Sequence, residues 1–175
     1  MTQKIKMLGF VALFLFVAVQ AYSQKCKYEY QKTDGLTGKK TKAVLHKVSK
    51  TLNMRFKAVE NSYSMDILIY FTGFNMGSAN TKISLETDDS ISFKLSTGEI
   101  VSISVPKQII PDMRQDKLAL FHLYENIPVD KEILEKLSNT IILYICLCNE
   151  KKIAEGSLKE KDAKALQDKI KCILQ

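Results

Sequence analysis

Cysteine is the residue type in this chain whose positions point most directly to chemistry. Four cysteines allow three complete pairings, and they are Cys26, Cys146, Cys148 and Cys172. Cys146 and Cys148 alternate on one predicted strand, whose rise places their Cα atoms roughly 6.5–7 Å apart, whereas a disulfide prefers about 5.5–6 Å. We therefore expect Cys146 and Cys148 to be buried free thiols, and we expect a disulfide to join Cys26 to Cys172, on the flank of the last predicted helix.

A metal-handling protein is one alternative that these cysteines raise. Together with His46, His122 or Met54, they could supply soft ligands for copper or zinc. However, the spacing of Cys146 and Cys148 is not that of a structural zinc site, and no CxxC or HxxxH pattern occurs. We predict no metal site and no cofactor.

A small hydrolase with spatially assembled carboxylates and a histidine is the other alternative. The chain has no GxSxG, HExxH or glycine-rich phosphate loop and contains only two histidines. His122 lies within an apolar segment typical of a core histidine, and Asp66 has the pattern of a polar residue at a strand edge. The sequence therefore favours a non-enzymatic protein and predicts no catalytic residue.

The segment 72–78 is the predicted ligand-binding loop. It follows an apolar strand and contains two glycines, so that its backbone can approach a ligand closely. The candidate binding residues are Phe74, Asn75 and Met76. The simpler interpretation is a loop whose phenylalanine covers the core.

The N-terminus indicates where this chemistry takes place. Lys4 and Lys6 precede twelve residues, 8–19, that carry no polar side chain, and Ala21 and Ser23 then stand at −3 and −1 of a potential cleavage site. This order is typical of a secretory signal peptide, and the run falls short of the ~20 apolar residues that span a bilayer. We expect a signal peptide at 1–23 and one exported domain at 24–175, periplasmic or secreted. A retained N-terminal anchor is the competing interpretation.

Charge is distributed unevenly along the expected mature chain. Residues 25–60 hold ten Lys and Arg against three acidic residues, while 61–149 hold seven against eleven. The basic segment could bind an anionic envelope component or a protein partner. Lysines on strands that point to solvent explain the same charge distribution more simply. Arg55 is the only arginine in the basic segment, and no aromatic stacking platform is evident, so nucleic acid is excluded as the expected partner.

Alternating apolar residues predict the elements that must position these groups. We expect a mostly antiparallel sheet of about seven or more strands, followed by helices at about 129–138 and 158–173. This is an α+β fold with both helices packed on the sheet. Ser157 and Glu160 have the spacing of a capping box at the start of the last helix. The strands are expected near 26–30, 41–48, 52–59, 65–71, 82–86, 91–95, 101–105, 118–124, 140–148 and 153–155.

Overall fold

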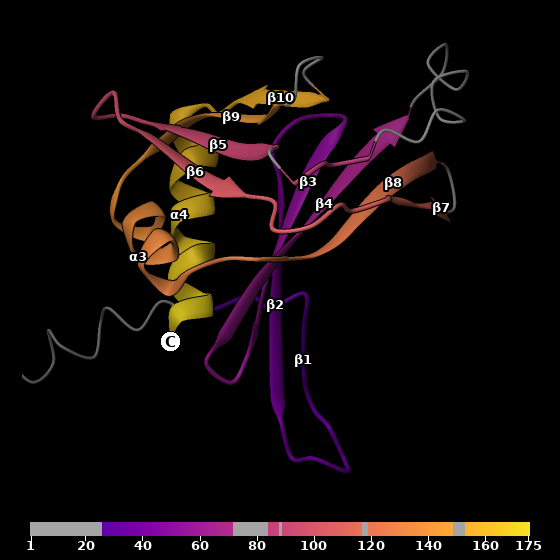
Figure 1. Cartoon of the computed structure of the whole chain (residues 1–175). Helices are drawn as coiled ribbons and strands as arrows, with labels where there is room; N and C mark the ends of the chain where they lie inside the picture. Colours follow the sequence, from indigo (N-terminus) through magenta and orange to yellow (C-terminus); the bar gives the residue numbers. More distant parts are fainter. Residues whose placement is uncertain (1–25, 72–83, 88, 117–118, 149–152) are drawn as a thin grey trace, which may run out of the picture.

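The alternating segments of the sequence form two antiparallel sheets. The structure is a computed structural model that describes residues 26–71, 84–87, 89–116, 119–148 and 153–175. The six-stranded sheet has the order β1-β2-β3-β4-β8-β7, and the four-stranded sheet has the order β10-β9-β5-β6 (Figure 1). The chain is therefore an α+β protein, as the sequence predicted.

Most strand bounds follow the predicted alternation closely, although the strand expected at 26–30 lies instead at Tyr30–Thr33. In β3, every second side chain is buried and the intervening ones are partly exposed, because successive side chains of a strand point to opposite faces. The strands of the larger sheet are β1 (Tyr30–Thr33), β2 (Lys40–Lys47), β3 (Leu52–Val59), β4 (Ser62–Phe71), β7 (Asp112–Asp116) and β8 (Ala119–Pro128), and those of the smaller sheet are β5 (Ser90–Leu95), β6 (Ile100–Ser104), β9 (Ile142–Cys148) and β10 (Ala154–Ser157).

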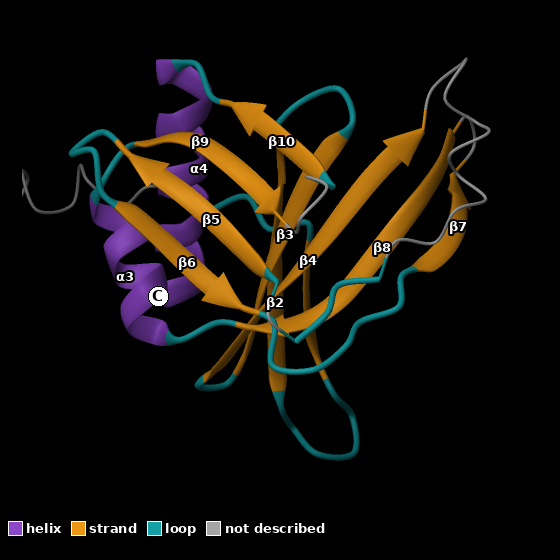
Figure 2. Cartoon of the chain, turned by 45° about the horizontal axis from the view of Figure 1, so that its top comes forward, coloured by secondary structure: helices purple, strands orange, loops and turns teal. Residues whose placement is uncertain are grey.

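Two helices lie on the same side of the four-stranded sheet. Figure 2 shows α3 (Lys131–Asn139) and α4 (Glu160–Leu174) behind β5, β6 and β9. The buried face of α4 includes Ala163, Leu166 and Ile170, and this helix also packs against β2 and β3 of the larger sheet. One hydrophobic cluster consequently joins both sheets and both helices. Neither helix is long and apolar enough to cross a membrane.

Two sequence-based expectations about the sheets are wrong. The predicted strand at 82–86 contributes, in its described part, one isolated bridge between Leu85 and Ile109. Strand β5 pairs with β6, its neighbour in sequence, and with β9, far along the chain. In addition, the segment Asp112–Asp116, where no strand was expected, forms the edge strand β7, paired with β8. Long-range pairing, which local periodicity does not specify, decides both cases.

The predicted capping box is also wrong. Ser157 lies within β10 and pairs with Tyr144 of β9, so α4 begins only at Glu160, with Lys159 at its N-cap and no side-chain cap hydrogen bond. The next residue, Leu158, continues the ladder by donating its N–H to the Leu143 carbonyl at 2.9 Å. Because the backbone of Ser157 pairs with β9, Ser157 cannot take the N-cap position that a capping box requires.

Candidate functional site

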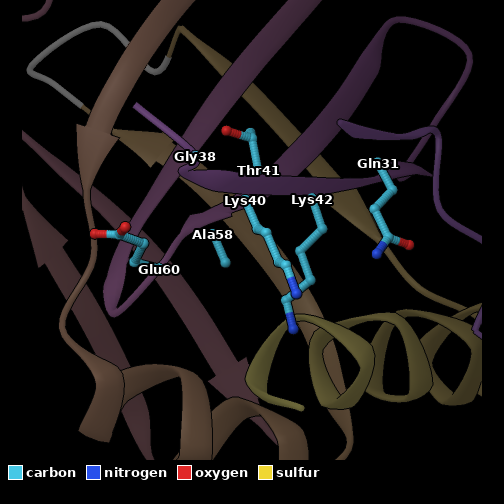
Figure 3. Close-up of a pocket in the computed structure, with 7 residues that line it drawn as sticks. All are labelled: Gln31, Gly38, Lys40, Thr41, Lys42, Ala58 and Glu60. Carbon is cyan, nitrogen blue, oxygen red and sulfur yellow. The ribbon is translucent and has the colours of Figure 1, made fainter. Parts of the chain in front are cut away.

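An open hollow lies beside the hairpin formed by β1 and β2. This hairpin extends beyond the ends of both helices, so that the sheet face near its tip is left uncovered (Figure 1). The hollow has a volume of about 440 Å³, within the range of ligand pockets. Its lining comes from β1, β2, β3 and the turns that connect them and lead into β4 (Figure 3): Gln31, Gly38, Lys40, Thr41, Lys42, Ala58 and Glu60.

The turn that shapes this hairpin is built around Asp34. Its Oδ1 accepts hydrogen bonds from the Thr37 N–H at 2.6 Å and from the Leu36 N–H at 3.1 Å, and these bonds lower the pKa of the Asp34 carboxyl below its usual value. Gly38 has a φ of 68°, which glycine adopts without steric cost. The turn leaves Leu36 at the tip with a side chain that is 99% exposed.

Two lysines of β2 supply the positive charge of the hollow. Lys40 and Lys42 are two residues apart, so strand geometry places them on one face, and Figure 3 shows their side chains extending in the same direction while Thr41 points the opposite way. Lys42 lies opposite Gln31 on one side and Ala58 on the other. Within the described ranges, neither lysine forms an ion pair with a carboxylate.

One acidic residue stands at the rim of the hollow. Glu60 occupies the β3–β4 turn in a left-handed conformation with a φ of 54°, and its N–H donates to the Lys40 carbonyl at 3.2 Å. Figure 3 shows its carboxylate directed away from the two lysine ammonium groups. The hollow therefore combines two cations without a protein counter-charge, an amide from Gln31 and the methyl of Ala58.

The opposite face of the same sheet carries basic residues that are already neutralised. Arg55 donates to Glu29 at 2.6 Å and to Asp66 at 3.2 Å, and Lys57 lies 2.5 Å from Asp66. Hydrogen bonding to Glu29 is the largest cause that raises the pKa of Arg55. Asp66 is 1% exposed and also accepts the Asn126 N–H at 2.9 Å. These charges stabilise one another, unlike those of Lys40 and Lys42, for which no ion pair is found in the described ranges.

The place of Asp66 corrects a prediction. Asp66 lies in β4, a central strand with neighbours on both sides, and not at a strand edge. Asp66 lies directly opposite Arg55 in the ladder between β3 and β4, so its side chain meets the cations of β3. The residue is an ion-pair partner in the interior, where burial without partners would be costly.

The two histidines are buried in separate strands. The ring of His122 on β8 packs edge-on against Phe71, with centroids 4.6 Å apart. His46 on β2 is 4% exposed, and neither of its ring nitrogens has a hydrogen-bond partner among the described residues. Burial is the main cause that lowers the pKa of His46 to about 4. In the described part of the chain, no group of three or more His, Cys, Asp or Glu side chains is arranged to hold a metal ion.

The cysteines form two pairs of disulfide geometry. Cys26 and Cys172 have Cα atoms 5.6 Å apart, and Cys146 and Cys148 have Cα atoms 5.4 Å apart, both within the range that a disulfide requires. No cysteine is free. The expectation of free thiols at 146 and 148 is therefore wrong: it assumed a fully extended strand, whereas β9 brings these two Cα atoms closer together than that rise allows.

The two disulfides constrain the chain very differently. In the chain-entropy model, the long loop closed by Cys26 and Cys172 contributes about 5 kcal/mol, whereas a loop that encloses one residue contributes about 1.6 kcal/mol. The first pair fixes the start of the described chain to the end of α4. The second adds little to the stability of the fold.

The predicted ligand-binding residues Phe74, Asn75 and Met76 lie outside the described residues, as does the predicted signal peptide. The hollow was not singled out from the sequence, although its lysines belong to the segment recognised as basic. The alternation of β2 places both lysines on one face, and this pattern is the sequence feature that could have indicated the site. Comparison with protein-family models, with curated proteins and with solved structures gave no match.

Proposed function

We propose that this protein is an exported, non-enzymatic binding domain that holds an anionic group of its ligand in the hollow beside the β1–β2 hairpin. The observation that carries the proposal is the pair Lys40 and Lys42 on one face of β2, without an acidic partner in the described ranges. Other basic side chains nearby, such as Arg55 and Lys57, already have carboxylate partners. Lys40 and Lys42 are therefore basic residues of the N-terminal half that are available to bind an anion.

The lining residues suit a phosphate or carboxylate group. Two ammonium groups attract a doubly charged anion more strongly than one ammonium group does. Each lysine ammonium is a compact point charge on a flexible stem, which suits the binding of phosphate. The Gln31 amide can donate a hydrogen bond to an anionic oxygen, while Ala58 supplies apolar contact. A volume of about 440 Å³ accommodates a headgroup-sized ligand.

Export is part of the same proposal. It is supported by the lysine, apolar and small-residue order of residues 1–23 and by two cysteine pairs at disulfide distance, which are compatible with an oxidising compartment. An exported domain with a basic pocket meets anionic components of the cell envelope. N-terminal sequencing of the exported form is expected to begin at Gln24, and a retained Met1 would contradict the cleavage.

The proposal is tested with two probes and a matched pair of variants. We expect inorganic pyrophosphate, titrated by calorimetry at low salt, to bind the natural chain, and Lys40→Gln combined with Lys42→Gln to weaken binding at least about tenfold, the effect of losing about 1.4 kcal/mol. The control, Lys47→Gln combined with Lys50→Gln, removes the same charge outside the hollow. Equal losses in both double variants would show that only overall charge matters and would overturn the site.

Vesicles distinguish the source of the anion. If the ligand is a lipid headgroup, phosphatidylglycerol vesicles bind the natural chain, phosphatidylcholine vesicles do not, and Leu36→Glu weakens vesicle binding while pyrophosphate binding is unchanged. A free anion as ligand gives pyrophosphate binding without vesicle binding. Absence of binding to both probes would contradict an anion site at this hairpin.

A further inference from the structure

The outer face of the four-stranded sheet carries a chemical group that the proposed binding function does not use. Cys146 and Cys148 alternate on β9 with Ile145 and Leu147, whose side chains belong to the hydrophobic cluster. Because successive side chains of a strand point to opposite faces, the cysteines occupy the face of β9 opposite to Ile145 and Leu147. Their disulfide joins two residues of the same strand and therefore does not connect separate elements of the fold.

This arrangement separates the disulfide from the stability of the fold. Its ring encloses only residue 147, so forming it removes little freedom from the unfolded chain. Reduction therefore leaves the β-ladders and the core intact, since Ile145 and Leu147 hold β9 in place. By contrast, the Cys26–Cys172 pair spans 146 positions of sequence, and its reduction is opposed by the folding of the chain.

The surroundings of the pair favour one sulfur as the point of attack. Cys148, at the end of β9, is partly exposed, whereas Cys146 is 4% exposed. Ser92 lies opposite Cys146 in the ladder, and its hydroxyl is 2.9 Å from that of Ser102. Hydroxyl groups next to a leaving sulfur can donate hydrogen bonds to the thiolate that forms, which favours its charged state. Glu155, also opposite Cys146, accepts a hydrogen bond from the Tyr144 hydroxyl.

We propose that Cys146 and Cys148 form a reversible disulfide that exchanges with a dithiol. A thiolate of the dithiol attacks Cys148 Sγ, the bond between Cys146 Sγ and Cys148 Sγ breaks, and Cys146 leaves as a thiolate. The second thiolate of the dithiol then attacks the first sulfur of the dithiol, which is bonded to Cys148 Sγ in the mixed disulfide, and so releases the Cys148 thiolate. Two electrons pass to the protein, the dithiol becomes a disulfide, and its two protons end on Cys146 and Cys148. The reverse sequence donates the electrons.

A redox titration of the full oxidised chain tests the ease of exchange. The chain is equilibrated in mixtures of reduced and oxidised dithiothreitol, quenched with a maleimide and read at each cysteine by peptide mass spectrometry. We expect Cys146 and Cys148 to be half reduced at a ratio of reduced to oxidised reagent at least about tenfold lower than that for Cys26 and Cys172. Circular dichroism is expected to remain unchanged at that point. Reduction of both pairs at one ratio, or free thiols at 146 and 148 after oxidation, would overturn the proposal.

Two single variants test the direction of attack. Cys146→Ser leaves the partly exposed Cys148 free, and Cys148→Ser leaves the buried Cys146 free. With oxidised glutathione as the probe, we expect Cys146→Ser to form its mixed disulfide at least about tenfold faster, because exposure controls access to the thiol. Equal rates, or a faster Cys148→Ser variant, would contradict attack at Cys148. The titration of the natural chain stands independently if either variant fails to fold.

Discussion

At the scale of single residues, burial and pairing decide what a charged or polar side chain does. Arg55 and Lys57 alternate with apolar residues on β3, a pattern typical of side chains that point to water. Both do face away from the core, but they converge on the buried Asp66. That convergence depends on the pairing of β3 with β4, which places Arg55 opposite Asp66 and which no local pattern of residue types indicates.

His46 gives a pH prediction at the residue scale. Its pKa is lowered to about 4 in the folded chain from 6.5, so the folded state excludes a proton that the unfolded state binds. Stability is therefore complete above pH 6.5, declines as the pH falls and levels off below about 4, with a total loss of about 3 kcal/mol. The charged groups facing the ring from α4 are Lys169, which disfavours protonation, and Asp162, which favours it.

Urea unfolding at pH 7.5, 5.5 and 4.5, with both disulfides kept oxidised, measures this effect. The control is His46→Met, which removes the titrating group and retains a side chain that suits the core beside Met54, its cross-strand neighbour. We expect the variant to lose much less stability across this interval. A pH slope as steep as that of the natural chain would show that other groups are responsible.

At the scale of elements, periodicity predicted where strands and helices lie, and pairing decided where they end. The alternation in β2 and β3 predicted their bounds to within one residue. The start of α4 was predicted from Ser157, whose backbone is instead held by β9. The hollow beside the hairpin of β1 and β2 depends on how far the helices reach along the sheet (Figure 1).

Gly156 joins two elements closely and provides the prediction at this scale. A Cβ at Gly156 of β10 would lie 2.7 Å from Val48 Cγ1, just beyond β2. Because valine is stiff at χ1, we expect Gly156→Ala to lower the free energy of unfolding by about 1–3 kcal/mol. Denaturant unfolding measures the change. The control is Gly35→Ala, where a Cβ meets open space.

A double-mutant cycle identifies the cause. Val48→Ala removes the methyl that the new Cβ would strike, so Gly156→Ala in that background is expected to cost less by at least about 0.5 kcal/mol. Strictly additive costs would mean that the loss at Gly156 arises from backbone effects and not from contact with Val48.

At the scale of the whole molecule, the pairing of Cys26 with Cys172 closes the described chain on itself. We expect Cys172→Ser to lower the free energy of unfolding by about 2–5 kcal/mol and to leave Cys26 reactive toward a thiol label. Chemical denaturation and labelling under native conditions measure the two effects. The matched control, Cys148→Ser, opens only the short loop and is expected to cost less than about 2 kcal/mol. Equal losses, or an unreactive Cys26, would contradict this assignment.

The sequence by itself determined the α+β class, the two late helices and most strand positions, because alternation and helical periodicity are local consequences of which side chains must be buried. It also indicated the basic N-terminal segment. Only the tertiary structure decided that the strands divide into two sheets, that Asp66 is enclosed by cations, that Cys146 meets Cys148, and that Lys40 and Lys42 border a hollow. Each of these depends on contacts between residues brought together by pairing and packing, and such contacts are not encoded in local spacing.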